Sequence, residues 1–510
     1  MQNSVFCRFF LWLYHAAGQS AVIRAIEVAV GAVGRALRGS IFGRILCRET
    51  SIDSYTGTSV LYRGMGVVRE GITGFFTRMY GKLRSVNSGS LNMRLYEKTL
   101  GGSFLFHLES LLAVFVLLIF ILPHKMWNNL YATALTALLT VVYFLCIISG
   151  RKDMEERPKG GLWFPLLFFM FAVVLGTIGS PTPGDSIRVL AFFVTAFLLC
   201  VVVRGTLSSY AKIDFFLRGI VLALLLTGAY AAVQRVMGVA ADASLTDLEL
   251  NRNMPGRVFG TLGNPNNFAE FLMLFIPFAL AFSINQERKG WRVLGIAAVI
   301  VGTVALVLTY SRSGWLAFAL AAVVFIALYN WRLLPILFLV GVLCIPLLPQ
   351  TVLNRILTIG NLADSSSSYR VDIWTGSLRM LRDGYWFAGT GLGAGAFTSV
   401  YPAYAVGTSG VAPHTHMQFM EMLAELGILG FLSLLWYSIS LSRRTAVSAA
   451  ATVSRKMRNV LCAAAASMAG ITAIGFVEYT WFYPRVQLAF FIAAGIAMAA
   501  VHIAGKEQKK

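Results

Sequence analysis

Three cation-capable side chains, Arg312, Arg370 and His416, stand beside or between long apolar stretches of this chain. Polar groups close to lipid are costly, so they are usually well paired or functional. Guanidinium groups hold phosphate oxygens in a two-point fork. Imidazole groups, whose ordinary pKa is near 6.5, can accept a proton from a hydroxyl group. The three residue types together predict an anion site that contains a proton acceptor.

Each of these residues also has a simpler interpretation. Arg312 could reach the membrane interface and fix a helical hairpin, and Arg370 could pair with Asp372, two residues later. His414 competes with His416 as the proton acceptor, and the His-x-His spacing could hold a metal ion. No third outer ligand stands out, so the sequence predicts neither a metal nor another cofactor.

A polar stretch opens an apolar segment near residue 265. Asn264, Asn266 and Asn267 surround a proline and follow Arg257 by a few residues. Asparagine at a helix start is an ordinary N-cap, but three of them beside an arginine could also line a polar cleft.

Two carboxylates, Glu421 and Glu425, lie one helical turn apart in another apolar segment. Carboxylates at such depth need partners, so pairing with an arginine or with backbone donors is expected. We therefore consider five residues as candidate substrate-binding groups: Arg257, Asn264, Asn267, His414 and Glu425.

Composition sets the fold class. The 510 residues are 57% hydrophobic and only 13% charged, whereas soluble domains carry about 25% charged residues. Stretches of about 20 apolar residues, each long enough to cross a membrane, recur from residue 104 onward, which disfavours a soluble α-solenoid. The prediction is an all-α polytopic transmembrane bundle of about 12 spans, at 104–122, 127–149, 162–179, 186–203, 215–237, 265–284, 291–310, 313–330, 333–349, 417–440, 459–479 and 485–504.

The formal net charge of +20 is better explained by membrane topology than by nucleic-acid binding. Lysine and arginine accumulate in cytoplasmic loops of membrane proteins, and most of the 43 Lys and Arg residues fall on one side of the predicted spans. This bias predicts that both termini lie in the cytoplasm. The extracytoplasmic side then holds two longer segments, about 238–264 and 350–416.

The chain divides into two predicted domains. Residues 1–103 carry 13 Lys and Arg but 5 Asp and Glu, and Ala21–Leu46 has the pattern of an amphipathic helix on an anionic inner leaflet. A partly disordered basic tail is the alternative. Residues 104–510 form the membrane domain. The six cysteines are scattered without a CxxC pair, so neither a disulfide framework nor a zinc site is indicated.

The outer segment 350–416 is longer than a membrane loop needs, and such loops often carry function. Ser365–Ser368 are expected to be a flexible entry. Arg370–Leu381 has the periodicity of a short amphipathic helix, with Ile373, Trp374, Ser377, Leu378 and Leu381 on one stripe. The run Gly389–Gly395 lacks the strand that a nucleotide-binding loop requires, so tight turns are expected there.

Five segments in this order resemble the O-antigen ligase and polymerase superfamily. They are Arg-Val-Phe-Gly-Thr-Leu-Gly-Asn-Pro-Asn-Asn-Phe-Ala, Tyr-Ser-Arg-Ser-Gly-Trp-Leu-Ala, Arg-Val-Asp-Ile-Trp, Gly-Thr-Gly-Leu-Gly-Ala-Gly-Ala-Phe, and His416 nine residues before Glu-Leu-Gly. The resemblance covers about residues 250–435. Each segment is a weak signal alone, and the ordered set is more specific.

The resemblance implies a membrane glycosyltransferase that acts at the outer face of the cytoplasmic membrane. Such enzymes move a glycan from an undecaprenyl-diphosphate carrier to a hydroxyl of a glycan, lipid or protein acceptor, without a cofactor or nucleic acid. By motif, the diphosphate-holding arginines correspond to Arg312 and Arg370, and the activating histidine to His416. In the family an asparagine usually follows that histidine, where this chain has Met417. The choice between His414 and His416, and between polymerase, ligase and protein glycosylation, stays open.

Two other functions compete. A transporter of anions or lipid-linked sugars would have broken helices and midplane charges in paired halves, whereas the candidate charges here cluster at one interface. The cell-wall peptidoglycan polymerase group depends on an outer-loop aspartate, for which Asp364, Asp372 and Asp383 are available. The segments around these aspartates fit that group poorly.

Overall fold

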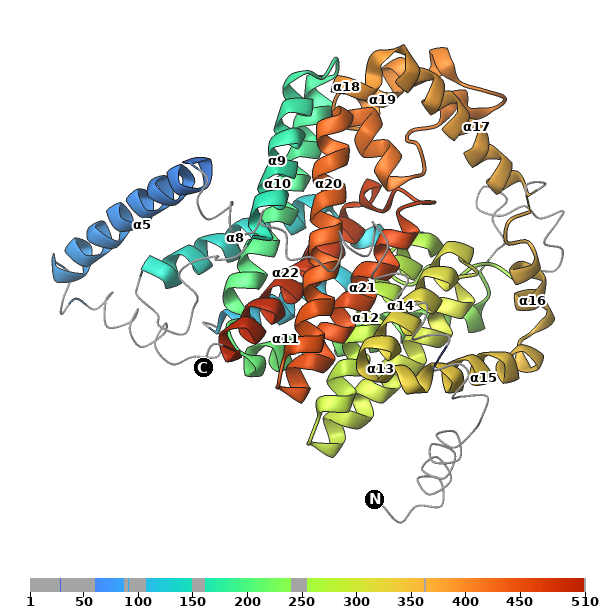
Figure 1. Cartoon of the computed structure of the whole chain (residues 1–510), viewed down its shortest axis with the longest axis horizontal. Coiled ribbons are helices and arrows are strands. Elements are labelled where there is room, and N and C mark those ends of the chain that lie inside the picture. The colour runs from blue at the N-terminus through green and yellow to red at the C-terminus, as the bar shows by residue number, and fades with distance from the viewer. Residues whose placement is uncertain are drawn as a thin grey trace.

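The computed structural model describes residues 28, 60–86, 90, 107–148, 161–239, 255–361 and 364–508 of the chain. Within these residues all regular secondary structure is helical (Figure 1). The predicted all-α polytopic bundle is confirmed. The predicted helix over Ala21–Leu46 and most of the outer segment 238–264 lie outside the described residues.

The first half of the bundle runs through α7 (Leu108–Ile121), α8 (Asn129–Ile148), α9 (Trp163–Ile178), α10 (Pro183–Thr206), α11 (Tyr210–Met237) and α12 (Pro265–Asn285). The second half contains α13 (Lys289–Leu308), α14 (Arg312–Asn330), α15 (Leu334–Cys344), α20 (Gln418–Ala451), α21 (Arg455–Ile474) and α22 (Pro484–Glu507).

Nine helical segments of the described chain are long and apolar enough to span a membrane, and α7 and α9 are shorter apolar helices. Eleven of the predicted spans overlap these helices, although α20 continues to Ala451, past the predicted end at 440. The predicted span 333–349 covers α15, which has 11 residues and buries none of them. This segment continues α14 in one apolar helical stretch, Arg312–Leu347. Figure 1 shows α15 at the edge of the bundle, away from the central helices.

The centre of the bundle consists of α12, α21 and α22, whose apolar windows are the most buried of the spans. Helix α12 places successive phenylalanines into this core, including Phe271, Phe275 and Phe278. Helix α21 contributes the small residues Ala463–Ala466, which are almost fully buried. Small side chains let membrane helices approach closely, so this packing holds the helix ends in fixed positions.

The two ends of the bundle differ in charge. One end joins α12 to α13 and α20 to α21, where Lys456 pairs with Glu287 at 2.6 Å and Arg458 donates to the Tyr329 carbonyl. This end carries most of the short basic loops. The opposite end holds the starts of α12, α14, α20 and α22, together with residues 350–416.

The outer segment is ordered into short helices. It contains α16 (Gln350–Leu357), α17 (Ser365–Met380), η5 (Leu381–Tyr385), α18 (Trp386–Ala388), α19 (Ala394–Val400), η6 (Tyr401–Tyr404) and η7 (Ser409–Val411). The expectation of a flexible Ser365–Ser368 is wrong, because these serines are the first turn of α17. Asp364 caps that turn by accepting from the Ser366 backbone N–H.

The expected amphipathic stripe of α17 is only partly right. Ile373 and Ser377 are buried, as is Met380, but Leu378 is 52% exposed. The buried face of α17 is therefore rotated by about one residue relative to the predicted face. Ile373 and Met380 pack against Phe397 and Tyr401, which attaches α17 to the rest of the outer segment.

The glycine run forms tight turns, as expected. Gly389, Gly391 and Gly393 all have φ between 78° and 107°, a region that favours glycine. The turn docks on α20 where Gly427 interrupts that helix. Carbonyls freed by the interruption accept from the run, with Thr390 N–H 2.7 Å from the Ala424 oxygen.

Helix α5 (Val60–Val86) belongs to the basic N-terminal region. Phe76 makes an edge contact with Phe144 of α8, at 5.6 Å between ring centroids. Phe75, Met79 and Leu83 form an exposed apolar stripe at helical spacing. A membrane-surface role for this region stays a prediction. The four cysteines that the structure describes are free thiols.

Candidate functional site

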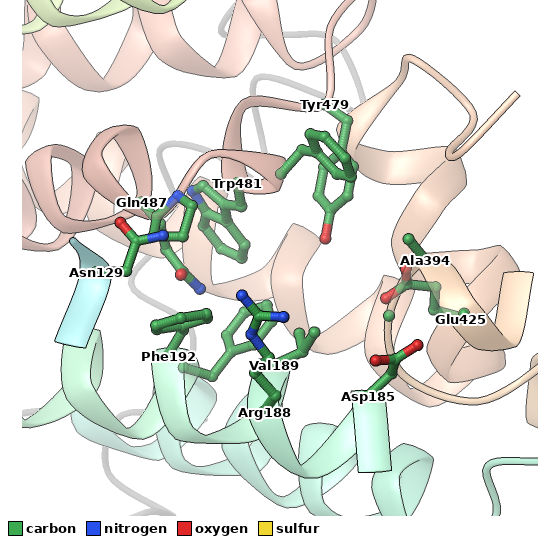
Figure 2. Close-up of a pocket in the computed structure, with 15 residues that line it drawn as sticks. Asn129, Asp185, Arg188, Val189, Phe192, Ala394, Glu425, Tyr479, Trp481 and Gln487 are labelled. Atoms are coloured by element: carbon green, nitrogen blue, oxygen red, sulfur yellow. The ribbon is translucent and has the colours of Figure 1, made fainter. Parts of the chain in front are cut away.

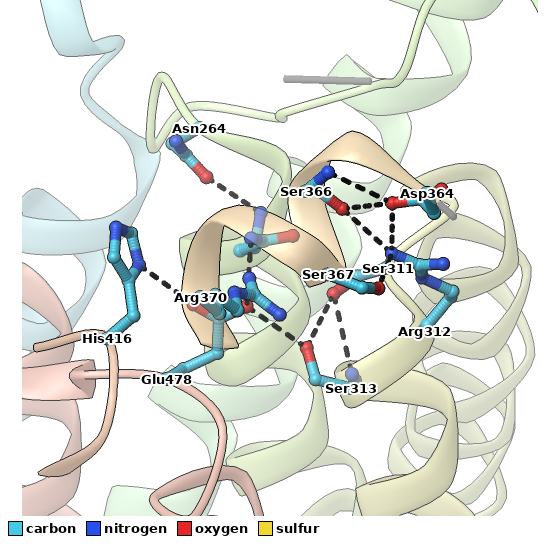
Figure 3. Close-up of polar contacts among 12 residues, drawn as sticks. Asn264, Ser311, Arg312, Ser313, Asp364, Ser366, Ser367, Arg370, His416 and Glu478 are labelled. Atoms are coloured by element: carbon cyan, nitrogen blue, oxygen red, sulfur yellow. Dashed lines mark hydrogen bonds and ion pairs between the residues drawn. The ribbon is translucent and has the colours of Figure 1, made fainter. Parts of the chain in front are cut away.

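The site lies at the end of the bundle that holds the outer segment. It is assembled from the starts of α12, α14 and α17, the loop before α20, and the loop between α21 and α22 (Figure 3). Arg312, Arg370 and His416 all reach this end, as the sequence predicted. Chain segments more than 200 residues apart therefore meet in one polar cluster.

Glu478 is the centre of the cluster, and the sequence analysis missed it. Its Oε1 accepts from Arg370 Nη2 at 2.5 Å and from Asn266 Nδ2 at 3.1 Å. Ser313 Oγ lies 3.4 Å from the same oxygen. The other oxygen, Oε2, is 4.0 Å from His416 Nδ1. One buried carboxylate thus joins an arginine and a histidine that the sequence had only grouped by type (Figure 3).

The pKa of Glu478 reflects this setting. Burial alone would raise the pKa, but the Arg370 guanidinium and the neighbouring His416 outweigh burial and lower it to about 2. Glu478 is therefore a carboxylate at any pH near neutrality. A fixed negative charge beside His416 can orient the imidazole and stabilise its protonated form.

We expect Glu478 to make folding stability depend on pH. Its folded pKa of about 2 is below the ordinary 4.5, so its stabilisation is complete above about pH 4.5 and is lost as the pH falls toward 2. The shift corresponds to about 3 kcal/mol. Unfolding of the wild type and Glu478→Gln in detergent between pH 3 and 7 checks this, with the exposed Glu507→Gln as control. A stability gap that stays constant over this range would contradict it.

Arg257 extends the cluster toward α13. Its Nη2 donates to Asn266 Oδ1 at 2.5 Å, and its Nε donates to the Thr309 carbonyl at 2.8 Å. Burial and the nearby arginines lower the pKa of Arg257 to about 9, so it is still a cation at neutral pH. Asn266 therefore bridges Arg257 to Glu478.

The other two asparagines have different contacts, and Asn264 fits the ordinary N-cap interpretation. Asn264 is the N-cap of α12, and its side chain accepts from the Asn266 backbone N–H at 2.8 Å. Asn267 is buried in the first turn of α12. Of the three, Asn266 contacts the cluster directly. Spacing alone does not distinguish them, because neighbouring positions on a helix face different directions.

Arg312 is tightly held by the outer segment. Its Nη2 lies 2.9 Å from Asp364 Oδ1 and 2.8 Å from Ser366 Oγ, and its Nη1 donates to the Thr358 carbonyl at 2.8 Å. Asp364 also pairs with Arg355 at 3.5 Å. Arg312 therefore fixes the start of α17 against the α13–α14 hairpin. It adjoins the Glu478 cluster through Ser313, the next residue in the chain.

The expected local pair of Arg370 with Asp372 is not formed. Arg370 turns instead to Glu478, 108 residues further along the chain. Only its Nη2 is bonded to Glu478, and the side chain is 21% exposed. Among the described residues, Glu478 is the hydrogen-bond partner found for this guanidinium.

The two histidines have different surroundings. His414 is buried against Phe482 and Tyr479, at 4.3 and 5.6 Å between ring centroids. Burial and then His416 hold the pKa of His414 well below its ordinary value. His416 is 25% exposed and has φ of 53°. A positive φ is uncommon for a non-glycine residue and occurs most often at functional sites.

The pair of carboxylates on α20 is buried next to this loop. Glu421 accepts from the Thr415 backbone N–H at 2.5 Å, so it holds the chain between the two histidines. The Glu425 carboxyl interacts with Glu421 and with the Gly393 backbone N–H, and it lines a cavity. The expected pairing with backbone donors is thus found for both carboxylates.

The amino-acid sequence that forms much of the site is similar to that of a known family. Residues 297–435 match the family model described as O-Antigen ligase, a range that includes Arg312, Arg370 and His416 and ends before Glu478. A search of curated proteins found no match. This match and the helical membrane bundle support the resemblance to the O-antigen ligase and polymerase superfamily, and with it a role in surface polysaccharide assembly.

Proposed function

We propose that the protein is a membrane glycosyltransferase that moves a glycan from undecaprenyl diphosphate to an acceptor hydroxyl. The observation that carries the proposal is the meeting of Arg370 and His416 at Glu478. A partly exposed arginine and a partly exposed histidine lie on one buried carboxylate. Phosphate binding and proton transfer, the two tasks of this reaction, then have candidates within one cluster.

The charge of the cluster favours a diphosphate. Arginines outnumber carboxylates across the connected contacts, with Arg257, Arg312, Arg355 and Arg370 against Asp364, Glu478 and the deeper Glu270. Surplus positive charge in a poorly solvated site attracts an anion more strongly than it would in water. The surplus also stabilises the negative charge that grows on a leaving diphosphate.

Arg370 is our candidate for direct contact with the diphosphate. It uses one nitrogen on Glu478 and keeps the rest of its fork available, which suits two-point binding of phosphate oxygens. Arg312 has both terminal nitrogens bonded to the outer segment. We assign Arg312 to positioning α17, and hence Arg370, and to the local positive field.

His416 is our candidate for the base. It is more exposed than His414, and Glu478 lies on its Nδ1 side. Nε2 is then the nitrogen available to an acceptor. His414 is packed among aromatic rings and its Nδ1 accepts from the His416 backbone N–H at 3.1 Å. That contact supports His416 in its unusual backbone conformation.

The proposed reaction is a single displacement at the anomeric carbon. The acceptor hydroxyl oxygen attacks the anomeric carbon from the face opposite the diphosphate, and its proton passes to His416. The bond from the anomeric carbon to the phosphate oxygen breaks, and its electron pair leaves with the lipid diphosphate beside Arg370. The configuration is inverted, and neither a metal ion nor a nucleotide takes part. Glu478 stabilises the imidazolium that forms.

The orientation is also part of the proposal. The basic loops gather at the end of the bundle remote from the cluster, and cytoplasmic loops are rich in Lys and Arg. We therefore place both termini in the cytoplasm and the cluster at the outer face of the inner membrane. There it would meet a lipid-linked donor, surrounding lipids and a glycan, lipid or protein acceptor.

The test is deletion of the gene, followed by analysis of surface glycans and lipid-linked intermediates. Loss of one surface glycan with a single repeat unit on the carrier indicates a polymerase, and long polymer on the carrier indicates a ligase. Unchanged glycans and intermediates would overturn the proposal. Counterflow of lipid-linked sugar in liposomes without product would instead support a transporter.

A further inference from the structure

A cavity of about 320 Å³ lies between the start of α10 and the segment that follows Glu478 (Figure 2). Its walls are the start of α10, the turn Gly393–Gly395, and the segment from Tyr479 to Gln487. A side chain at Gly395 would collide with the Asp185 carboxylate. The glycine run therefore lets the outer segment close one wall of this cavity.

Two buried polar side chains, Glu425 and Gln487, line the cavity. Glu425 is fully buried and Gln487 is 2% exposed. Glu425 interacts with the Glu421 carboxyl and the Gly393 backbone N–H, whereas no hydrogen-bond partner in the described chain is found for Nε2 of Gln487. Buried polar groups are normally satisfied, so the unpartnered Gln487 amide indicates a ligand that can accept a hydrogen bond.

Other lining groups extend this character. Figure 2 shows the Arg188 guanidinium, the Tyr479 hydroxyl and the Gln487 amide facing the same space, with Asp185 at its rim. Asp185 and Arg188 are exposed at the mouth of the cavity. Trp481, Phe192 and Phe482 supply aromatic surface. Aromatic walls with a few converging polar groups are typical of small-molecule sites.

The cavity borders the proposed catalytic histidine through a short chain of contacts. Tyr479 and Phe482 line the cavity and pack on His414. The His414 ring lies 4.1 Å from the His416 ring, measured between centroids. The His414 ring would therefore lie between the aromatic wall of the cavity and the proposed base, His416.

We propose that this cavity is a carbohydrate subsite that holds one sugar unit of the glycan, an inference that rests on the proposed glycosyltransferase function. Sugar hydroxyls would donate to Glu425 and accept from Gln487 and Arg188. The apolar face of the ring would lie against the aromatic wall. The volume falls at the lower end of the roughly 300–1,000 Å³ range of small-molecule sites, as a single ring requires.

Other ligand classes fit less well. A lipid chain would leave the Gln487 amide without a hydrogen bond, which is costly in a buried site. A phosphate group would meet the Arg188 guanidinium but also the carboxylates of Asp185 and Glu425. A neutral polyhydroxyl ring satisfies the carboxylate, the amide and the aromatic surface together.

The first test measures binding alone. Purified protein in nanodiscs is mixed with oligosaccharides released by mild acid from the cell's own surface polysaccharide, and binding is followed by saturation-transfer NMR. Ala394→Phe fills the cavity without removing a polar group, and Gln487→Leu keeps the volume but removes the amide. We expect each to weaken binding by roughly tenfold or more. The exposed Ala403→Phe is the matched control and should bind as the wild type does.

The second test measures transfer and separates the two sources of the sugar. A raised KM for the acceptor alone assigns the subsite to the acceptor glycan, and a raised KM for the lipid-linked donor alone assigns it to the donor. If the wild-type protein binds the oligosaccharides but transfers no glycan, the proposed function is wrong and the subsite proposal is unaffected. Unchanged binding and KM in both folded cavity variants would overturn the subsite.

Discussion

Replacing His416 by alanine is expected to lower the rate of glycosyl transfer by about 10²–10⁴-fold. The loss follows because the acceptor hydroxyl would no longer pass its proton to a positioned base. The substitution would also remove the imidazole that lies next to Oε2 of Glu478. The measurement is transfer from a lipid-linked donor by purified protein in proteoliposomes, with membrane insertion checked in parallel.

Backbone strain and base chemistry can be separated at this position. Asparagine tolerates the left-handed backbone that His416 adopts, so His416→Asn keeps the loop but lacks the base, and it should be as inactive as the alanine variant. His107→Ala, at a half-exposed histidine outside the cluster, should leave transfer unchanged. If His416→Asn retains more than a tenth of the activity, the base is another group.

Hydropathy was sufficient to locate most of the bundle. Spans such as 265–284 and 485–504 coincide with α12 and α22 within a few residues, because a membrane requires a fixed length of apolar helix. The segment 333–349 is less regular. Hydropathy reports that a segment is apolar, but α15 ends after 11 residues and continues α14 in one helical stretch. Length and burial of the folded helix cannot be obtained from an apolar average.

Local sequence also misled at the start of α17. A run of four serines is typical of a flexible segment, yet Asp364 caps them and Arg312 binds both Asp364 and Ser366. The stabilising contacts come from a hairpin more than 50 residues earlier. A signal was present in the sequence, since an aspartate before the first turn is a standard N-cap.

The centre of the site was beyond the reach of motif reasoning. Glu478 lies after the last resemblance segment, so no pattern drew attention to it. A lone carboxylate in the apolar run from Ile471 to Phe482 was nevertheless a signal, because such groups require a partner. Which partner it takes depends on how α21 and α22 pack against α17. Residue types predicted the kind of site, and tertiary packing decided its centre.

Arg370→Ala is expected to reduce transfer by about 10²–10³-fold, the range seen when one donor to a developing negative charge is removed. It also removes the partner of Glu478, and breaking a buried ion pair costs about 3–5 kcal/mol. The single variant alone would therefore leave two explanations for lost activity. Transfer and thermal unfolding are both measured for Arg370→Ala, Glu478→Gln and the double variant.

The double variant separates the two explanations, because the neutral glutamine that replaces Glu478 no longer needs a cation. Stability should recover toward the wild type by a large part of the pair's coupling, whereas transfer should stay as low as in Arg370→Ala. Recovery of both stability and transfer would show that Arg370 only pairs with Glu478 and does not bind the diphosphate.

Arg312→Lys offers a contrast, since a single ammonium cannot reproduce the contacts of both terminal nitrogens to Thr358, Asp364 and Ser366. That variant should lower stability and transfer together, as a positioning residue does.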